Sequence, residues 1–347
     1  MDFHIMSGDI IVGRWEKEAF TLIDKALAPL YLVNTGNVER WLETRAIDHH
    51  RANSRLLKKA LRLTEKDDIS TVISVHAATI TDNYWIKPFG SALNYNDVRF
   101  DNDYFAGLAL RGDYDSFNKS AYSKTTKTPE LTNTGSFEKC WKLKKNDWWM
   151  VKVADHKQLF SEIFIHELGK RLGFNMVEYF RGQKCVMTRD FTGNGKYNFE
   201  PAFSFMGDNE DYIAVIIKLR EVAPQAIADY VRMVFLDTIV ANPDRHTFNF
   251  GLLREAVTGK ILSLAPNFDN NMALISRGYP LSSLRKNDVL VKCFNELMEF
   301  DPELKQYVPS LMEDEIKAAL AKVNMKVKAD FVAKFIMNAY KQIDGAI

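Results

Sequence analysis

The sequence predicts an α+β fold of two lobes, a small α/β lobe ahead of a larger helical lobe, with a mainly helical region at the N-terminus. Three observations support this prediction. Short apolar runs around a polar turn occupy residues 137–153, which is the pattern of a β-hairpin. Helical periodicity marks residues 15–65 and dominates again from residue 212. We therefore expect three parts, residues 1–125, 126–191 and 192–347.

Composition narrows the class of protein. The 347 residues carry a formal net charge of +1, which argues against direct nucleic-acid binding, because phosphate binding usually leaves a basic excess. The three cysteines are far apart and predict neither a disulfide framework nor a zinc site. The sequence shows no signal-peptide pattern and no apolar run near the roughly 20 residues that span a bilayer. We expect a cytoplasmic protein with no membrane partner.

In the N-terminal region, RANSRLLKKALRL repeats its apolar residues at helical spacing and predicts a helix. His49 and His50 stand just before it. Adjacent side chains on a helix do not share a face, so we interpret this pair as solvated helix surface rather than a metal or nucleic-acid site. Residues 91–130 are rich in Asn, Asp, Ser, Thr and Lys, which predicts loops or a lobe boundary.

The small lobe reads as strand, turn and strand over FEKCWKL, KKND and WWMVKV. LFSEIFIHELGKRLGF then predicts a helix, and VEYF and KCVMTRDF predict two strands. In the large lobe, YIAVIIKLREV predicts a helix. A second helix, PQAIADYVRMVFLDTIVAN, opens with Pro224, where a first-turn proline is favourable. FNFGLLRE and KILSLAP predict a hairpin around AVTG, and the tail from about residue 313 is helical again.

Polar residues gather where the second large-lobe helix ends, in ANPDRHTFNFG. Asp244 and Asn249 lie there, and the following hairpin should return Asp269 of LAPNFDNN toward them. Mg²⁺ bound with a nucleotide phosphate takes one or two such oxygen ligands. A remaining Asp can accept the proton of a hydroxyl nucleophile. The alternative is a buried turn network, which Asp and Asn often form.

Upstream, Lys152 lies inside the apolar run WWMVKV, and a lysine there needs either a route to water or an anionic partner. Glu162 follows on the next helix and could pair with Lys152, as kinases do to hold nucleotide phosphates. On its own, Glu162 would read as solvated helix surface. Before the strand, Gly135 stands among Thr132, Thr134 and Ser136, where backbone N–H groups could cover phosphates or form an ordinary hydroxyl-rich turn.

The order of these parts is that of a two-lobed phosphotransferase. NPDRHTFNFG followed by PNFD resembles the catalytic and metal-binding segments of the HipA-like serine/threonine kinases, a bacterial toxin-kinase family. TNTGSFEK resembles the phosphate loop of that family, with Glu138 and Lys139 in the match. SEIFIHELGKRLGF resembles its next helix, and VMTRDF its lobe-connecting strand. The resemblance covers roughly residues 125–275; DRHxxN is shared with phosphoinositide kinases.

The resemblance implies a bilobal protein-kinase-like fold and transfer of phosphate from ATP, with Mg²⁺, to a Ser or Thr of a protein substrate. It implies Asp244 as the catalytic base and Asn249 and Asp269 as metal ligands. Arg245 and His246 would form the scaffold of the catalytic loop. The nucleotide-contacting set that it implies is Lys152, Glu162, Thr132, Thr134, Gly135, Ser136, Met187, Arg189, Asp190 and His246.

Members of the family can autophosphorylate a serine in the phosphate loop, but the residue three before Gly135 is Thr132, so Thr132, Thr134 and Ser136 are all candidates. The first 110 residues look more helical than the mostly β subdomain of better-known members. Two alternatives stay open beside the protein kinase. One is a phosphoinositide-like or small-molecule kinase. The other is a non-catalytic pseudokinase or corepressor partner of a DNA-binding, helix-turn-helix antitoxin.

Overall fold

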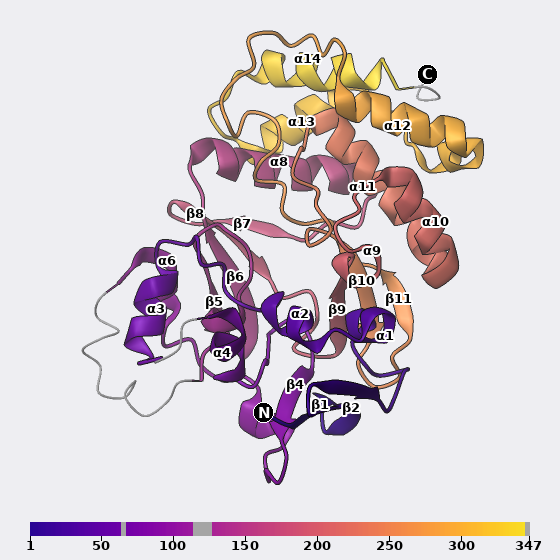
Figure 1. Cartoon of the computed structure of the whole chain (residues 1–347). Helices are drawn as coiled ribbons and strands as arrows, with labels where there is room; N and C mark the ends of the chain where they lie inside the picture. Colours follow the sequence, from indigo (N-terminus) through magenta and orange to yellow (C-terminus); the bar gives the residue numbers. More distant parts are fainter. Residues whose placement is uncertain (64–66, 114–126, 344–347) are drawn as a thin grey trace. The chain divides into compact units, whose positions relative to one another are not determined.

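The structure of the chain is a computed structural model that describes residues 1–63, 67–113 and 127–343 (Figure 1). The chain forms two compact units. Unit 1 contains Met1–Val153, Met187–Glu200 and Leu253–Ile261, and unit 2 contains Ala154–Val186, Pro201–Leu252 and Leu262–Ile347. Each unit therefore combines three separate stretches of the sequence.

Unit 1 begins with an antiparallel sheet. Its strands are β1 (Phe3–Ser7), β2 (Ile10–Glu16), β3 (Ala19–Leu22) and β4 (Tyr84–Pro88), in the order β3-β2-β1-β4. Ile5 lies opposite Gly13 on one side and Ile86 on the other. Ile5, Val12 and Ile86 are almost completely buried, so this sheet has an apolar core of its own.

This sheet was not predicted, because the N-terminal region was expected to be mainly helical. The helices that follow are short, and they are α1 (Leu30–Thr35), α2 (Val38–Glu43), α3 (Ser54–Ala60), α4 (Asp68–Ile73), α5 (Tyr95–Val98) and α6 (Ala106–Arg111). β1, β2 and β3 pair with their neighbours in sequence, and only β4 joins the sheet from about eighty residues away, a pairing that local periodicity cannot reveal.

The helix predicted in RANSRLLKKALRL is confirmed as α3, but the two histidines before it are not helical. His49 and His50 lie in a turn, and their ring centroids are 4.0 Å apart. The predicted helix surface at this pair is therefore wrong, because the two side chains of a turn can lie on the same side. With Asp48 they form the one group of three metal-ligating side chains found among the described residues. In the polar stretch 91–130, α5 and α6 replace expected loops, and residues 114–126 lie outside the described residues.

The predicted strand, turn and strand are confirmed as β5 (Lys139–Lys144) and β6 (Asp147–Val153). Lys145 and Asn146 both have positive φ, 49° and 68°, which is the requirement of a two-residue type I′ hairpin turn. β6 lies between β5 and β8 (Cys185–Arg189), and β7 (Tyr179–Arg181) follows β8. η2 (Pro129–Thr132) leads the chain into the loop before β5.

Unit 2 is mainly helical. Its helices are α8 (His156–Arg171), α9 (Phe203–Met206), α10 (Tyr212–Val222), α11 (Ile227–Val240), α12 (Val289–Phe300), α13 (Glu313–Val323) and α14 (Ala329–Tyr340), with the short turns η3 (Pro224–Ala226) and η4 (Pro302–Tyr307). α11 packs against α10, α12 and α14 (Figure 1). Ten of its fourteen residues are buried, so it is the central helix of this unit.

The predicted hairpin around AVTG is confirmed as β10 (Gly251–Glu255) and β11 (Ile261–Leu264). β9 (Tyr197–Pro201), which the sequence did not predict, pairs on the other side of β10. Among the described helices, none combines the length and the apolar character that a membrane span requires.

Candidate active site

The loop after α11 carries Asp244 and Asn249. Ala241 ends the helix in the left-handed conformation, at φ 52°, and turns the chain into this loop. Asn249 donates its side-chain N–H to the backbone oxygen of Asp244 at 2.8 Å. This hydrogen bond fixes the amide of Asn249 and leaves its oxygen as the atom able to bind a cation. The Asp244 side chain is partly exposed, as a residue that meets a substrate must be.

Arg245 holds this loop in place from the protein interior. Its guanidinium is buried and donates to both carboxylate oxygens of Asp237 on α11, at 2.7 and 3.0 Å. Burial alone would lower the pKa of Arg245, but the carboxylate of Asp237, and then that of Asp269, raise it above its ordinary value. Arg245 therefore remains a cation in the protein interior.

The same guanidinium joins two loops that are separated in sequence. One nitrogen donates to the carbonyl oxygen of Asn249 at 2.8 Å and to that of Phe268 at 2.6 Å. Another donates to the side-chain oxygens of Asn267 at 3.0 Å and Asn270 at 2.8 Å. The segment that contains Asp269 therefore lies beside the loop of Asp244 and Asn249. The buried turn network, weighed above as the alternative, is present, and the role of the three oxygen-bearing side chains as metal ligands and base stays a prediction.

The backbone around Asp269 is held on both sides. Asp269 has φ 59°, a conformation that costs free energy for a non-glycine residue and is common at functional sites. Its N–H donates to the hydroxyl oxygen of Tyr179 at 3.0 Å, and the N–H of Asn270 donates to the carboxylate of Glu162 at 3.0 Å. Burial, followed by the charges of Glu162 and Asp269, raises the pKa of Tyr179 well above its ordinary value, so the phenol stays neutral.

The alternative reading of Glu162 as solvated helix surface is wrong. Glu162 is completely buried on α8 and orients the backbone next to Asp269. Lys152 belongs to unit 1, so its pairing with Glu162 remains a prediction.

His246 accepts the backbone N–H of Phe248 through Nδ1 at 3.3 Å, which places it inside the loop as a scaffold.

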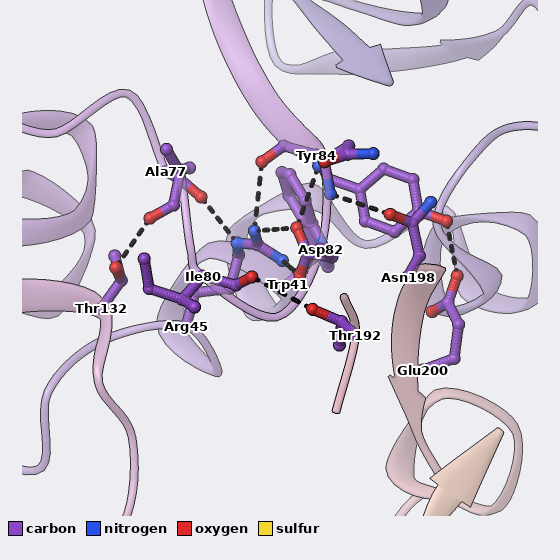
Figure 2. A network of polar contacts seen from close by, with 12 residues as sticks. Trp41, Arg45, Ala77, Ile80, Asp82, Tyr84, Thr132, Thr192, Asn198 and Glu200 are labelled. Carbon is purple, nitrogen blue, oxygen red and sulfur yellow. Dashed lines mark hydrogen bonds and ion pairs between the residues drawn. The ribbon is translucent and has the colours of Figure 1, made fainter. Parts of the chain in front are cut away.

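The predicted phosphate loop lies in unit 1. Gly135 has φ 94°, and Thr134, Gly135 and Ser136 are exposed. Thr132, in contrast, is buried and donates its hydroxyl to the carbonyl oxygen of Ala78 at 2.7 Å (Figure 2). Sequence reasoning placed these hydroxyls together, but only those of Thr134 and Ser136 face solvent.

Two lysines border this loop. Lys139 of β5 and the buried Lys152 of β6 are direct cross-strand partners. The ammonium of Lys139 lies so close to Gly135 that a Cβ at this position would come within 2.4 Å of it. Like charges opposite each other on a sheet repel, and an anion between them would relieve that repulsion. In the sequence, Lys139 was noted only as part of a motif. Its position opposite Lys152 in the hairpin suggests a role beside the phosphate loop.

Behind the loop lies a buried ion pair that the sequence did not reveal. Arg45 donates to both carboxylate oxygens of Asp82, at 2.7 and 3.0 Å, and to the carbonyl oxygen of Ala77 at 2.9 Å. The Trp41 ring lies 4.8 Å from its guanidinium carbon. Figure 2 shows this cluster beside the Thr132 hydrogen bond, so the start of the phosphate loop rests on a rigid polar network.

The residues expected at adenine lie at the end of β8. Met187 contacts the ammonium of Lys144 through its sulfur at 3.4 Å, and Arg189 pairs with Asp147 at 2.8 Å. The carboxylate of Asp190 accepts the backbone N–H groups of Thr192 at 3.0 Å and Asn194 at 3.1 Å. Burial raises the pKa of Asp190 despite these bonds. In this structure the Asp190 side chain shapes the turn after β8.

Sequence reasoning missed Asp237 and Tyr179. The signal for Asp237 was available, because it is the one acidic residue in the apolar run VRMVFLDTIV, and a buried carboxylate needs a cationic partner. Tyr179 carried no comparable signal, since an aromatic residue in a short strand is ordinary.

Comparison with known families and structures gives a family model that matches the sequence and solved structures that resemble the chain. The sequence model of the HipA-like C-terminal domain family matches residues 121–331, well over half of the chain. No curated protein matches the chain. Among solved structures, the Shewanella oneidensis MR-1 complex of the toxin–antitoxin proteins HipA and HipB with operator DNA contains a chain 13% identical to this one. The TM-score is 0.56, over 98% of this chain and 97% of that one. The Helicobacter pylori proinflammatory kinase CtkA is 17% identical with a TM-score of 0.45, over 60% of this chain and 92% of that one.

Proposed function

Because this chain belongs to the family of the HipA-like C-terminal domain, we propose that it is a serine/threonine protein kinase that uses ATP and Mg²⁺. In this proposal the kinase has two lobes. Residues 126–191 form the nucleotide-binding lobe, and residues 192–347 form the catalytic lobe. The HipA structure shares the fold of this chain, and the residues of the site supply the argument for chemistry.

One observation carries the proposal, the buried guanidinium of Arg245 that joins the Asp244–Asn249 loop to the Asp269 segment. A turn that served stability alone would not require three oxygen-bearing side chains at the edges of the two joined loops. The amide oxygen of Asn249 and the carboxylate of Asp269 are hard oxygen donors, which fit Mg²⁺. When bound, Mg²⁺ would supply positive charge to the nucleotide phosphates.

Asp244 then has the role of catalytic base. Its backbone oxygen is tied to Asn249 while its side chain is partly exposed, so the carboxylate can accept the proton of a Ser or Thr hydroxyl. In unit 1, the loop around Gly135 and the lysines Lys139 and Lys152 would hold the phosphates. Met187 and Arg189 would lie near adenine, where the sequence places the lobe-connecting strand.

Autophosphorylation would act on Thr134 or Ser136 rather than Thr132. The hydroxyl of Thr132 is buried and already donates to Ala78, so phosphorylation there would require the network behind the loop to open. The hydroxyls of Thr134 and Ser136 lie on exposed residues. We also propose a small antitoxin as a partner, because the similar HipA chain was solved in complex with HipB and operator DNA.

The proposal is tested by incubating the full chain with γ-labelled ATP and Mg²⁺, with and without an added protein substrate such as casein. We expect label on the chain or on the added protein, and its loss in Asp244→Ala. The matched control is Asp208→Ala, which removes an exposed carboxylate of the same unit. Equal labelling of wild type and Asp244→Ala, or no Mg-ATP binding by the wild type, would refute the kinase. Mapping the label distinguishes Thr134 from Ser136.

A further inference from the structure

The phosphate loop is held by an arginine that lies far upstream of it in sequence. Arg51 donates to the backbone oxygen of Gly135 at 2.7 Å, to that of Thr134 at 3.0 Å and to that of Asn133. Its guanidinium is buried, with the carboxyl groups of Glu130 and Glu138 nearby. Three successive carbonyl groups therefore converge on one side chain.

This convergence fixes the direction of the loop's N–H groups. In a planar trans peptide, the C=O and the N–H point in opposite directions. The carbonyls of residues 133–135 face Arg51, so the N–H groups of residues 134–136 face away from it. Within the part of the chain that the structure describes, these three N–H groups donate to no protein acceptor. Successive N–H groups that point to one side form an anion-binding concavity.

The segment around Arg51 also holds both ends of the loop. The N–H of Ile47 donates to the carbonyl oxygen of Leu131 at 2.9 Å, before the loop. After it, Asn53 donates to the carboxylate of Glu138 through its backbone and side chain, at 3.2 and 3.1 Å. Residues 47–53 therefore act as a clamp along the whole loop.

We propose that Arg51 is a positioning residue for nucleotide binding, which holds the N–H groups of residues 134–136 toward the phosphates of ATP without touching the nucleotide. The inference rests on the proposed kinase function and deepens it. Arg51 lies outside the family match, which begins at residue 121, so part of the nucleotide site is built by the N-terminal region. Removing the guanidinium leaves three carbonyl oxygens without their donor, and the peptides can rotate.

The test compares ATP with adenosine, because only ATP carries the phosphates that the loop would bind. Binding to the full chain is measured by calorimetry in the presence of Mg²⁺ for wild type, Arg51→Ala and Arg51→Lys. We expect Arg51→Ala to weaken ATP binding at least about tenfold, the loss of one charge-assisted hydrogen bond. Adenosine affinity should not change. The ATP affinity of Arg51→Lys should lie between those of the wild type and Arg51→Ala. An ammonium lacks the planar fork of donors with which the guanidinium reaches three carbonyl groups.

The matched control is Arg55→Ala, which removes an exposed arginine of α3 and should leave both affinities unchanged. If Arg51→Ala does not fold, Arg51→Lys carries the comparison, and wild-type ATP affinity in that variant overturns the proposal. Equal losses for ATP and adenosine also overturn it, because they indicate a general structural defect. If the wild type binds no Mg-ATP, the kinase function itself fails. If the wild type binds Mg-ATP and the Arg51 variants bind ATP with the same affinity, only the positioning role of Arg51 fails.

Discussion

Replacing Asp237 by Asn tests whether Arg245 is the anchor of the candidate active site. The two side chains form a buried pair, with exposed fractions of 3% for Arg245 and 0% for Asp237. Asp237 also accepts the side-chain N–H of Asn242 at 2.9 Å. The substitution keeps the size of the side chain but removes its charge, so the buried guanidinium loses the carboxylate with which it is paired.

The expected cost follows from this burial. Breaking a buried ion pair by removing one partner lowers the free energy of unfolding by about 3–5 kcal/mol. A typical domain has only about 5–15 kcal/mol in total. We therefore expect Asp237→Asn to unfold at a much lower urea concentration than the wild type, and to lose kinase activity as the two loops separate.

The measurement is urea unfolding followed by fluorescence and circular dichroism. The control is Asp229→Asn on the same helix, because Asp229 pairs with Arg232 at 3.3 Å where both side chains are partly exposed. Exposed pairs contribute at most about 1 kcal/mol, so this variant should remain close to the wild type. If Asp237→Asn is also within about 1 kcal/mol of the wild type, the anchoring role assigned to Arg245 is wrong.

Three further predictions concern single residues. Burial raises the pKa of Glu130 from 4.5 to about 7. Between these values the unfolded chain has lost a proton that the folded chain keeps, so the stability of the wild type falls as pH rises through this window. Glu130→Gln cannot ionise, so its free energy of unfolding should rise by about 3 kcal/mol relative to that of the wild type as the pH increases from 4.5 to 7. Urea unfolding measures this difference, and the same dependence of stability on pH in both proteins would contradict the prediction. Tyr179→Phe removes the acceptor of the Asp269 N–H and should raise the Mg²⁺ concentration for half-maximal phosphorylation, with Tyr307→Phe, on η4, as control. Asp155→Ala removes a cap that accepts the N–H groups of Lys157 and Gln158, and should lower the free energy of unfolding by about 1 kcal/mol; no loss would show that α8 is held by packing alone.

The elements that the sequence predicted well are those with local signals. The hairpin β5–β6 has a polar turn between apolar strands, and α8 has helical spacing and an N-terminal Asp. The loop of Asp244 and Asn249 was selected as a candidate because its polar residues stand together. What the sequence could not supply were contacts between distant segments. β1 and β4 pair across about eighty residues, and Arg51 lies 82–84 residues before the carbonyls that it holds.

Asp237 and Glu162 show a different limit. Helix surfaces carry acidic residues routinely, so Glu162 did not stand out as a buried partner. Asp237 is a lone carboxylate in an apolar run, but that signal does not say which cation it pairs with. Their roles follow only once Arg245 and the Asp269 segment are placed beside them. The expected chemistry of Asp244, Asn249 and Asp269 was read from motif and spacing, and the network that supports it required the three-dimensional structure.

The discontinuity of unit 1 has a consequence for synthesis on the ribosome. Arg254 of β10 donates to the carbonyl oxygen of Ala28 at 2.9 Å and pairs with Glu200, bridging residues that are 226 positions apart. Gly259 lies against the carbonyl of Ala26, where a Cβ would come within 1.8 Å. The last of the three stretches that form unit 1 ends at Ile261, so the contacts of Ala26 and Ala28 with this stretch cannot form until it has been made. Unit 1 therefore closes late in translation, well after the four strands of its N-terminal sheet have been made.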